Sequence, residues 1–177
     1  MNANNSLSIE FFPPKTPVGE EKLKHVRHEL YAASPAFFSV TYGAGGSTRD
    51  RTHDLVVEIL RDTGITPMAH LTCACHSRQE LVDVVTRYRD AGIENILALG
   101  GDPPADSDQP PGELKYASEL VDLIRGVGDF SIGVAAHPEP HPPRRRKRHG
   151  LDVRQLFHHG PARGPGLGPP VPGRGGP

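Results

Sequence analysis

The chain has 177 residues and a formal net charge of −1, with 36% apolar and 23% charged residues, which suits one domain with a sizeable core. No apolar run approaches the roughly 20 residues of a membrane-spanning helix, and the N-terminus lacks the basic and apolar regions of a signal peptide. Because the only cysteines, Cys73 and Cys75, are too close for a disulfide framework, composition argues against membrane proteins and disulfide scaffolds and predicts a cytoplasmic protein.

Apolar strand-like runs alternate with amphipathic helical segments through the first four fifths of the chain. The runs are short and apolar on both faces, which is typical of parallel strands covered by helices. One helix is marked by a capping box, Ser77-Arg-Gln-Glu80. In chain order we predict the strand Leu7–Phe12, the helix Glu20–Ala33, the strand Phe37–Tyr42, the helix Thr48–Asp62, the strand Pro67–Cys73, a helix from Ser77 to near Gly92, the strand Ile96–Leu99, the helix Ala117–Val127 and the strand Ser131–Ala136.

Regular strand–helix alternation predicts an α/β fold with a parallel sheet and right-handed crossovers. Two architectures fit, an open doubly wound sheet and a (β/α)8 TIM barrel. No Gly-x-Gly-x-x-Gly fingerprint follows the first strand, which weakens the dinucleotide-binding open sheet. Polar residues instead follow successive strands, which favours the barrel, where such ends converge on the active-site face; they are Glu10, Thr41-Tyr42-Gly43, His70, Gly101-Asp102 and His137.

Glu10 is a candidate general acid. It stands inside the apolar first strand, where burying an ionised carboxylate is costly and the protonated form is favoured. A protonated carboxyl can donate a proton near neutral pH. The alternative is a structural carboxylate paired with a buried base or a backbone donor.

Leu99-Gly-Gly-Asp-Pro-Pro104 is a candidate ligand loop after the fourth predicted strand. Two glycines allow backbone N–H groups to approach a flat or phosphorylated ligand, and Asp102 supplies an acceptor. A tight turn explains the same residues. The place at the carboxyl end of a barrel strand favours a ligand role.

His70-Leu-Thr-Cys-Ala-Cys-His76 invites a metal interpretation. Strand alternation, however, predicts Cys73 and Cys75 on one face and His70 and His76 on the other. Structural zinc sites use more widely spaced Cys pairs and a second ligand pair. We therefore predict no metal and favour His70 as a hydrogen-bonding cofactor contact.

The glycine- and hydroxyl-rich stretch from Thr41 to His53 joins a strand to a helix. Ser47 or Thr48 can cap that helix, and the small residues leave room for a ligand. An ordinary βα loop is the alternative, but the density of glycine, hydroxyl and charged residues favours binding.

The composition changes abruptly near residue 142. Residues 143–177 contain eight Gly, seven Pro, eight Lys or Arg, one acidic and one aromatic residue. Residues 1–142 contain twelve basic and twenty acidic residues. Their net negative charge argues against binding to nucleic acid. We predict a folded unit at 1–142 and a disordered tail at 143–177. A change of reading frame in a GC-rich gene would explain the tail; a nucleic-acid-binding or targeting tail around Arg144–Arg148 is a remote alternative.

The order and spacing of several blocks resemble the N-terminal half of methylenetetrahydrofolate reductases. The resemblance covers residues 8–142, about four fifths of the chain, and stops at the change of composition. The blocks are Ile9-Glu-Phe-Phe-Pro-Pro14, Ser39-Val-Thr-Tyr-Gly-Ala44, Arg49-Asp-Arg-Thr-His53, Ala69-His-Leu-Thr-Cys73, Ala98-Leu-Gly-Gly-Asp102, Tyr116-Ala-Ser118 and Val134-Ala-Ala-His-Pro-Glu-Pro-His141.

The resemblance implies a TIM-barrel flavoprotein in which NADH or NADPH reduces bound FAD, which then reduces 5,10-methylenetetrahydrofolate to 5-methyltetrahydrofolate. It implies that Glu10 is the general acid, that Asp102 lies between flavin and folate, and that Thr41 contacts nicotinamide. It also implies self-association of the complete enzyme. The positions implied to contact FAD are Tyr42, Ala44, His70, Gly100, Gly101, Asp102, Ala117, His137 and His141.

The sequence departs from the family pattern in two ways. Gly100 and His137 stand where some members carry Arg and Tyr. The family's later flavin- and folate-binding segments do not appear in residues 143–177. Only about five of the eight βα units are therefore expected, and a truncated, inactive fragment is the alternative to an active enzyme. A barrel needs eight strands to remove its sheet edges, so we expect the chain alone to be poorly soluble and not to retain FAD.

Overall fold

The computed structural model describes residues 7–43, 48–101 and 112–135. The predicted site residues Ala44, Asp102, His137 and His141 lie outside the described residues, as does the tail at 143–177. The described residues hold no helix that is long and apolar enough to cross a membrane. The elements are β1 (Ser8–Phe11), α1 (Pro17–Tyr31), β2 (Phe37–Val40), α2 (Arg49–Thr63), β3 (Met68–Thr72), α3 (Arg78–Asp90), β4 (Asn95–Leu99), α4 (Ala117–Val127) and β5 (Ser131–Val134).

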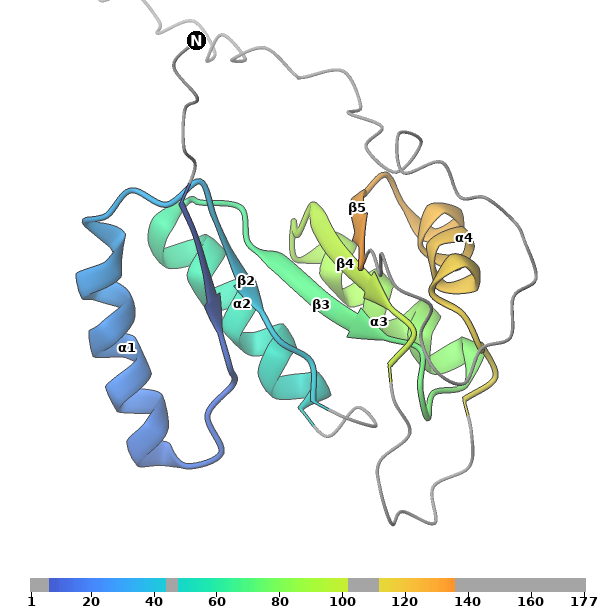
Figure 1. Cartoon of the computed structure of the whole chain (residues 1–177), viewed down its shortest axis with the longest axis horizontal. Coiled ribbons are helices and arrows are strands. Elements are labelled where there is room, and N and C mark those ends of the chain that lie inside the picture. The colour runs from blue at the N-terminus through green and yellow to red at the C-terminus, as the bar shows by residue number, and fades with distance from the viewer. Residues whose placement is uncertain (1–6, 44–47, 102–111, 136–177) are drawn as a thin grey trace, which may run out of the picture.

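The five strands form one parallel sheet in the order β1-β2-β3-β4-β5. Each strand is joined to its neighbour by a helix, and the helices pack against one face of the sheet (Figure 1). In a doubly wound sheet the strand order reverses at a switch point, and no reversal occurs among these five strands. The α/β class is confirmed, and the sequential winding is that of a partial TIM barrel.

The strand register separates an apolar helix-covered face from a polar open face. One row across the sheet lies against the helices, and it consists of Phe11, Val40, Ala69, Ile96 and Ile132. The preceding row lies on the opposite face, because successive side chains alternate. That row consists of Glu10, Ser39, Met68, Asn95 and Ser131. The face turned away from the helices therefore carries the candidate acid.

Local signals in the sequence explain where the helices begin and end. The Ser77 hydroxyl accepts from the Glu80 N–H at 3.2 Å, and Glu80 Oε2 accepts from the Ser77 N–H at 2.8 Å, so the predicted capping box is confirmed. Gly64 ends α2 in the left-handed conformation with φ 67°. Helix α1 begins at Pro17, earlier than predicted, because Thr16 caps it by accepting from the Gly19 N–H at 3.1 Å.

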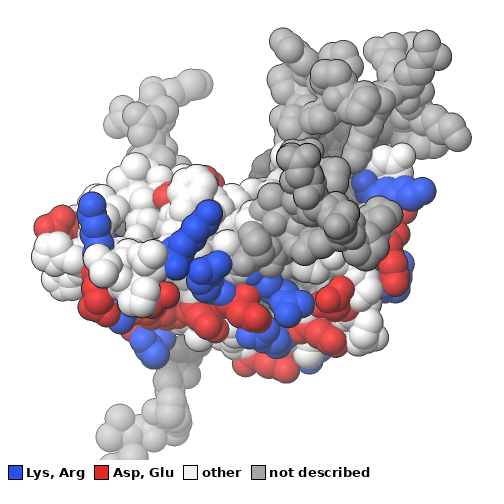
Figure 2. Space-filling view, turned by 90° about the horizontal axis from the view of Figure 1, so that it is seen from below, with Lys and Arg blue, Asp and Glu red and all other residues white. Residues whose placement is uncertain are grey.

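The carboxyl ends of the strands point to the lower edge of the molecule in Figure 1. Figure 2 views the molecule from that side, and the described basic and acidic side chains lie interspersed across this face. A surface that binds nucleic acid gathers basic residues in one patch or stripe. The described part of this face does not have that pattern.

Candidate functional site

Glu10, Ser39 and His70 come from three neighbouring strands and meet on the open face of the sheet. The Ser39 hydroxyl donates to Glu10 Oε2 at 3.4 Å, and His70 Nε2 lies 3.5 Å from the same oxygen. The Glu10–Ser39 pairing is set directly by the register of β1 and β2. A carboxyl, a hydroxyl and an imidazole are thus held together by backbone hydrogen bonding, which is a rigid way to position proton-transfer groups.

The expected burial of Glu10 is wrong, because its side chain is 48% exposed. Strand β1 lies at the edge of the described sheet, and Glu10 is on the face opposite the described helices. Ser39 and His70, which lie on inner strands, are buried. Burial among the described residues therefore does not explain an acid at this position, while the alternative of a carboxylate paired with a base has a partner in His70.

Burial lowers the pKa of His70 below its ordinary value of 6.5, and the nearby Glu10 carboxylate opposes that shift. The imidazole is therefore neutral near pH 7, so its contact with Glu10 is a polar contact rather than an ion pair. A neutral imidazole on the open face can donate or accept one hydrogen bond to a ligand. This fits the predicted role of His70 as a cofactor contact.

Two hydrogen bonds hold the backbone of Thr41, which directly follows β2. Its N–H donates to the Phe11 carbonyl at 2.9 Å, and its carbonyl accepts from Thr52 Oγ1 at 2.9 Å. Thr48 extends this network, because its Oγ1 accepts from the Gly43 N–H at 2.7 Å and lies 3.0 Å from Thr52 Oγ1. Thr48 is therefore the N-cap residue of α2 by position, but its side chain bonds to Gly43 and does not cap the helix. The prediction that the Thr48 side chain could cap this helix is wrong.

Tyr42 is buried, and its side chain is engaged away from the open face. Its hydroxyl lies 3.1 Å from His76 Nε2, and the two rings meet edge to face at 5.8 Å. Burial lowers the pKa of His76, which is therefore neutral and can share a hydrogen bond with the phenol. Any ligand contact at Tyr42 is left to its backbone. Sequence reasoning assigned no such pair, and it had no signal for it because the residues are 34 positions apart.

The loop after β4 approaches β3 at a point that admits only glycine. Gly101 has φ 72°, and a Cβ there would lie 2.8 Å from Thr72 Cβ. The Thr72 hydroxyl is buried and has no hydrogen-bond partner among the described residues. The buried Thr72 hydroxyl, the Gly101 backbone and the neutral His70 fit a flat polar group such as a flavin ring. Such a ring carries hydrogen-bond donors and acceptors that these groups can pair with. Thr72 was not singled out from the sequence, although its place at a strand end was a usable signal.

Two further predicted FAD contacts, Gly100 and Ala117, have other neighbours than Glu10, Ser39 and His70. The Gly100 carbonyl accepts from Cys73 Sγ at 3.2 Å. Ala117 is half-buried and begins α4, where Glu119 Oε2 accepts from the Tyr116 N–H at 2.9 Å. Both positions border the carboxyl ends of the strands, but the described geometry shows no side-chain contact between Ala117 and Glu10.

The Cys and His residues after β3 do not alternate as predicted. Strand β3 ends at Thr72, and Cys75 has φ 60°, so the strand period does not reach Cys75 and His76. Cys73 belongs to the helix-side core, whereas His70 lies beside Glu10 and His76 beside Tyr42. Across residues 7–43, 48–101 and 112–135, no group of three or more His, Cys, Asp or Glu side chains could hold a metal ion.

Comparison with known proteins gives one consistent result. The family model described as methylenetetrahydrofolate reductase matches residues 1–159. The 5,10-methylenetetrahydrofolate reductases of Pectobacterium carotovorum and Escherichia coli are each 44% identical over 137 residues, which is 77% of this chain and 45% of theirs. A probable methylenetetrahydrofolate reductase (NADH) of Oryza sativa is 40% identical over 141 residues, 24% of its length. The chain thus spans less than half the length of these relatives.

Proposed function

Because the chain belongs to the methylenetetrahydrofolate reductase family, we propose that it carries the acid-bearing part of a flavin-dependent reductase. The reaction is the reduction of 5,10-methylenetetrahydrofolate to 5-methyltetrahydrofolate with NADH or NADPH. The observation that supports this most is the meeting of Glu10, Ser39 and His70 on one face. These residues lie in blocks that the family resemblance also identifies.

In this proposal Glu10 delivers a proton to the folate nitrogen, while Ser39 and His70 hold its Oε2 in place. Asp102, outside the described residues, stabilises the positive charge that develops on folate. FAD, when bound, supplies hydride transfer between nicotinamide and folate. His70, Gly100, Gly101, Ala117 and the backbone of Tyr42 hold it, with Ala44, His137 and His141 contributing from outside the described residues, and Thr41 contacts nicotinamide.

The complete enzyme would then serve one-carbon metabolism and methionine supply in the cytoplasm, as a homo-oligomer that binds folate and nicotinamide. The proposed enzyme does not bind nucleic acid. The only basic cluster that suggests it, Arg144–Arg148, lies in the tail. Filter binding of the chain to duplex DNA at moderate salt would test that remote alternative.

A second candidate is a catalytically inactive fragment of the same enzyme. Two observations favour it. The chain covers only 45% of the Escherichia coli relative, and the described sheet has β1 and β5 at its two edges. A TIM-barrel site takes residues from the ends of several strands around the whole barrel, and five strands are described here. In that case the chain carries the acid but not a working pocket.

Purification of the full chain with added FAD separates the two candidates. An active enzyme is yellow after gel filtration, its flavin absorbance is bleached by NADH or NADPH, and methylenetetrahydrofolate restores it. Glu10→Gln should keep the bleaching step but slow the folate step by about 10²-fold or more, because only the latter needs the proton. A colourless protein with native-like circular dichroism supports the inactive fragment.

A further inference from the structure

The turn between β3 and α3, residues 73–77, contacts two segments that the proposed function assigns to FAD. Toward β4, Cys73 Sγ donates to the Gly100 carbonyl at 3.2 Å. Toward β2, the His76 ring pairs with the buried Tyr42 side chain, and its Nε2 lies 3.1 Å from the phenol oxygen. The position of this β3–α3 turn therefore affects the chain on two sides of the candidate site.

Gly112 packs directly against the backbone of the β3–α3 turn. A Cβ at Gly112 would overlap the Cys73 carbonyl oxygen, and it would lie 2.9 Å from the Cys75 nitrogen and 3.2 Å from the His76 nitrogen. All three are backbone atoms, which cannot swing aside as the end of a flexible side chain can. Only glycine permits such a close approach, so any side chain at this position must displace the turn.

Glu113 holds the same turn with two hydrogen bonds. Its N–H donates to the His76 carbonyl at 2.9 Å, and its Oε2 accepts from the Arg78 N–H at 2.9 Å. Arg78 begins α3, where the N–H groups have no partner within the helix and favour a negative charge. Because Ser77 and Glu80 already form a capping box for α3, the contacts of Glu113 serve to fix the turn rather than to start the helix.

The chain that follows these two residues is itself anchored. Leu114 is buried and belongs to the core. The N–H groups of Lys115 and Tyr116 donate to Glu119 Oε2 at 2.7 Å and 2.9 Å, which ties the segment to the first turn of α4. Close-packed protein transmits a displacement instead of absorbing it. A side chain added at Gly112 would therefore move the β3–α3 turn.

We propose that Gly112 and Glu113 are positioning residues for the candidate flavin site. They hold the β3–α3 turn at the place where it contacts the backbone of Gly100 and the side chain of Tyr42. Both act through the turn rather than by touching the flavin. The inference rests on the proposed function only in taking Gly100 and Tyr42 as flavin contacts, since the hold on the turn needs no ligand.

Gly112→Ala in the full 177-residue chain tests this contact by steric displacement. Hydrogen exchange read by mass spectrometry, without FAD, measures the protection of each segment. Exchange should become roughly tenfold faster in residues 73–77, the effect of about one lost backbone hydrogen bond. Residues 41–43 should follow because Tyr42 loses its partner, while α1 should exchange as before. Gly126→Ala is the matched control, since no atom lies within 4 Å of a Cβ there, and it should leave these segments unchanged.

Substitutions at Glu113 give a second test that does not depend on how well Gly112→Ala folds. Glu113→Ala removes the acceptor for the Arg78 N–H and should speed exchange around the β3–α3 turn roughly threefold. Glu113→Gln keeps a side-chain oxygen and should restore most of the protection. Unchanged protection of the turn in Glu113→Ala, or faster exchange spread evenly over all helices and strands, would overturn the proposal. Even spreading would mean that these residues contribute only to overall stability.

Flavin binding separates failure of this inference from failure of the proposed function. Titration of FAD fluorescence compares the original chain with Gly112→Ala and Gly126→Ala. We expect Gly112→Ala to weaken FAD binding about tenfold, because small displacements of positioning groups are costly, and Gly126→Ala to bind normally. Local loss of protection with no FAD binding by any form supports the positioning role and counts against the proposed function. Equal FAD binding by the original chain and Gly112→Ala supports the proposed function and overturns the positioning role.

Discussion

The Glu10 carboxylate lies close to His70 on the open face of the sheet, with its oxygen 3.5 Å from the imidazole nitrogen. Burial lowers the pKa of His70, and Glu10 acts in the opposite direction. Glu10→Gln removes the carboxylate charge but keeps a polar group beside Ser39. We expect the His70 pKa to fall further in this variant, as measured by an NMR titration of the imidazole protons. Glu80→Gln is the control, because Glu80 acts on His76 and should leave the His70 titration unchanged.

His76 and His70 make the fold sensitive to acid. Burial lowers the pKa of both below the ordinary value of 6.5, so the folded chain keeps them neutral at a pH where the unfolded chain binds protons. Stability is therefore complete above pH 6.5 and falls as the pH drops through 6.5 towards the lowered values. Urea unfolding at a series of pH values should show a loss on the acid side.

Replacement of His76 isolates its share of that loss. His76→Gln keeps a partner for the Tyr42 hydroxyl but cannot titrate, so the acid-side slope of the unfolding free energy should become shallower. At neutral pH the variant should lie within about 1.5 kcal/mol of the original chain, the scale of one hydrogen bond. An unchanged slope in His76→Gln would assign the acid sensitivity elsewhere.

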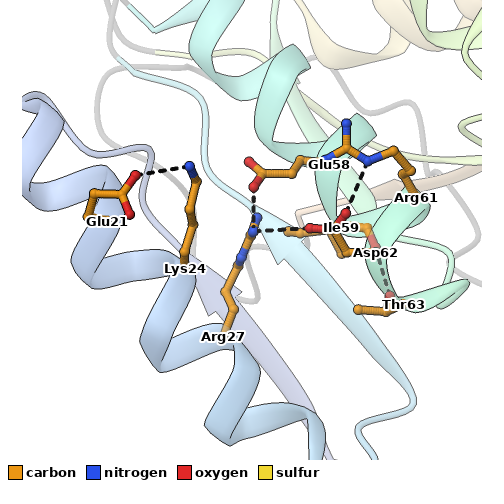
Figure 3. A network of polar contacts seen from close by, with 8 residues as sticks. All are labelled: Glu21, Lys24, Arg27, Glu58, Ile59, Arg61, Asp62 and Thr63. Carbon is orange, nitrogen blue, oxygen red and sulfur yellow. Dashed lines mark hydrogen bonds and ion pairs between the residues drawn. The ribbon is translucent and has the colours of Figure 1, made fainter.

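At the scale of elements, α1 and α2 are joined by a buried arginine (Figure 3). Arg27 is 2% exposed, and its Nη2 lies 2.8 Å from Glu58 Oε1 and 3.6 Å from Asp62 Oδ2. Its Nε and Nη1 are buried without a hydrogen-bond partner among the described residues. Both carboxylates are partly solvated, and Glu58 also lines a groove of about 490 Å³ beside the two helices. The desolvation cost therefore falls mainly on the arginine.

Because the desolvation cost falls mainly on Arg27, substitutions of Arg27 and of its partner Glu58 should change the free energy of unfolding unequally. Glu58→Ala leaves a buried guanidinium without its closest partner and should cost about 3 kcal/mol of unfolding free energy. Arg27→Met removes the buried charge and its unpaired donors while filling similar space, so it should cost less than about 1 kcal/mol. Urea denaturation of both variants measures the difference. A larger loss in Arg27→Met than in Glu58→Ala would mean that the ion pair itself stabilises the helix pair.

Local sequence patterns predict the helices and strands of this chain better than they predict the surroundings of individual side chains. The capping box at Ser77 depends on a few neighbouring residues, and it is found in the structure. The exposure of Glu10 depends on which strands lie beside β1, and the local apolar run contains no such information. The pairing of Tyr42 with His76 joins two loops and likewise requires the fold to be known. The sequence thus identified Glu10 as a candidate acid, a role that stays a prediction, but it did not predict the exposure of the Glu10 side chain.

At the scale of the whole molecule, the sheet and helices of residues 7–135 account for the described core. The described core residues come from the helices, the strands and the segments between them. The sequence of residues 143–177 offers few apolar side chains to bury. Folding free energy should therefore reside in the first unit, with the boundary near residue 142 where composition changes.

Removal of residues 143–177 tests this division. The shortened chain should keep its circular dichroism, and its unfolding free energy should change by less than about 0.5 kcal/mol, as expected for a region without packed contacts. Removal of α4 and β5 as well serves as the positive control, because buried residues such as Leu120 and Ile124 would be lost and cooperative unfolding should disappear. A loss of more than about 2 kcal/mol on removing only the tail would show that the tail packs against the sheet.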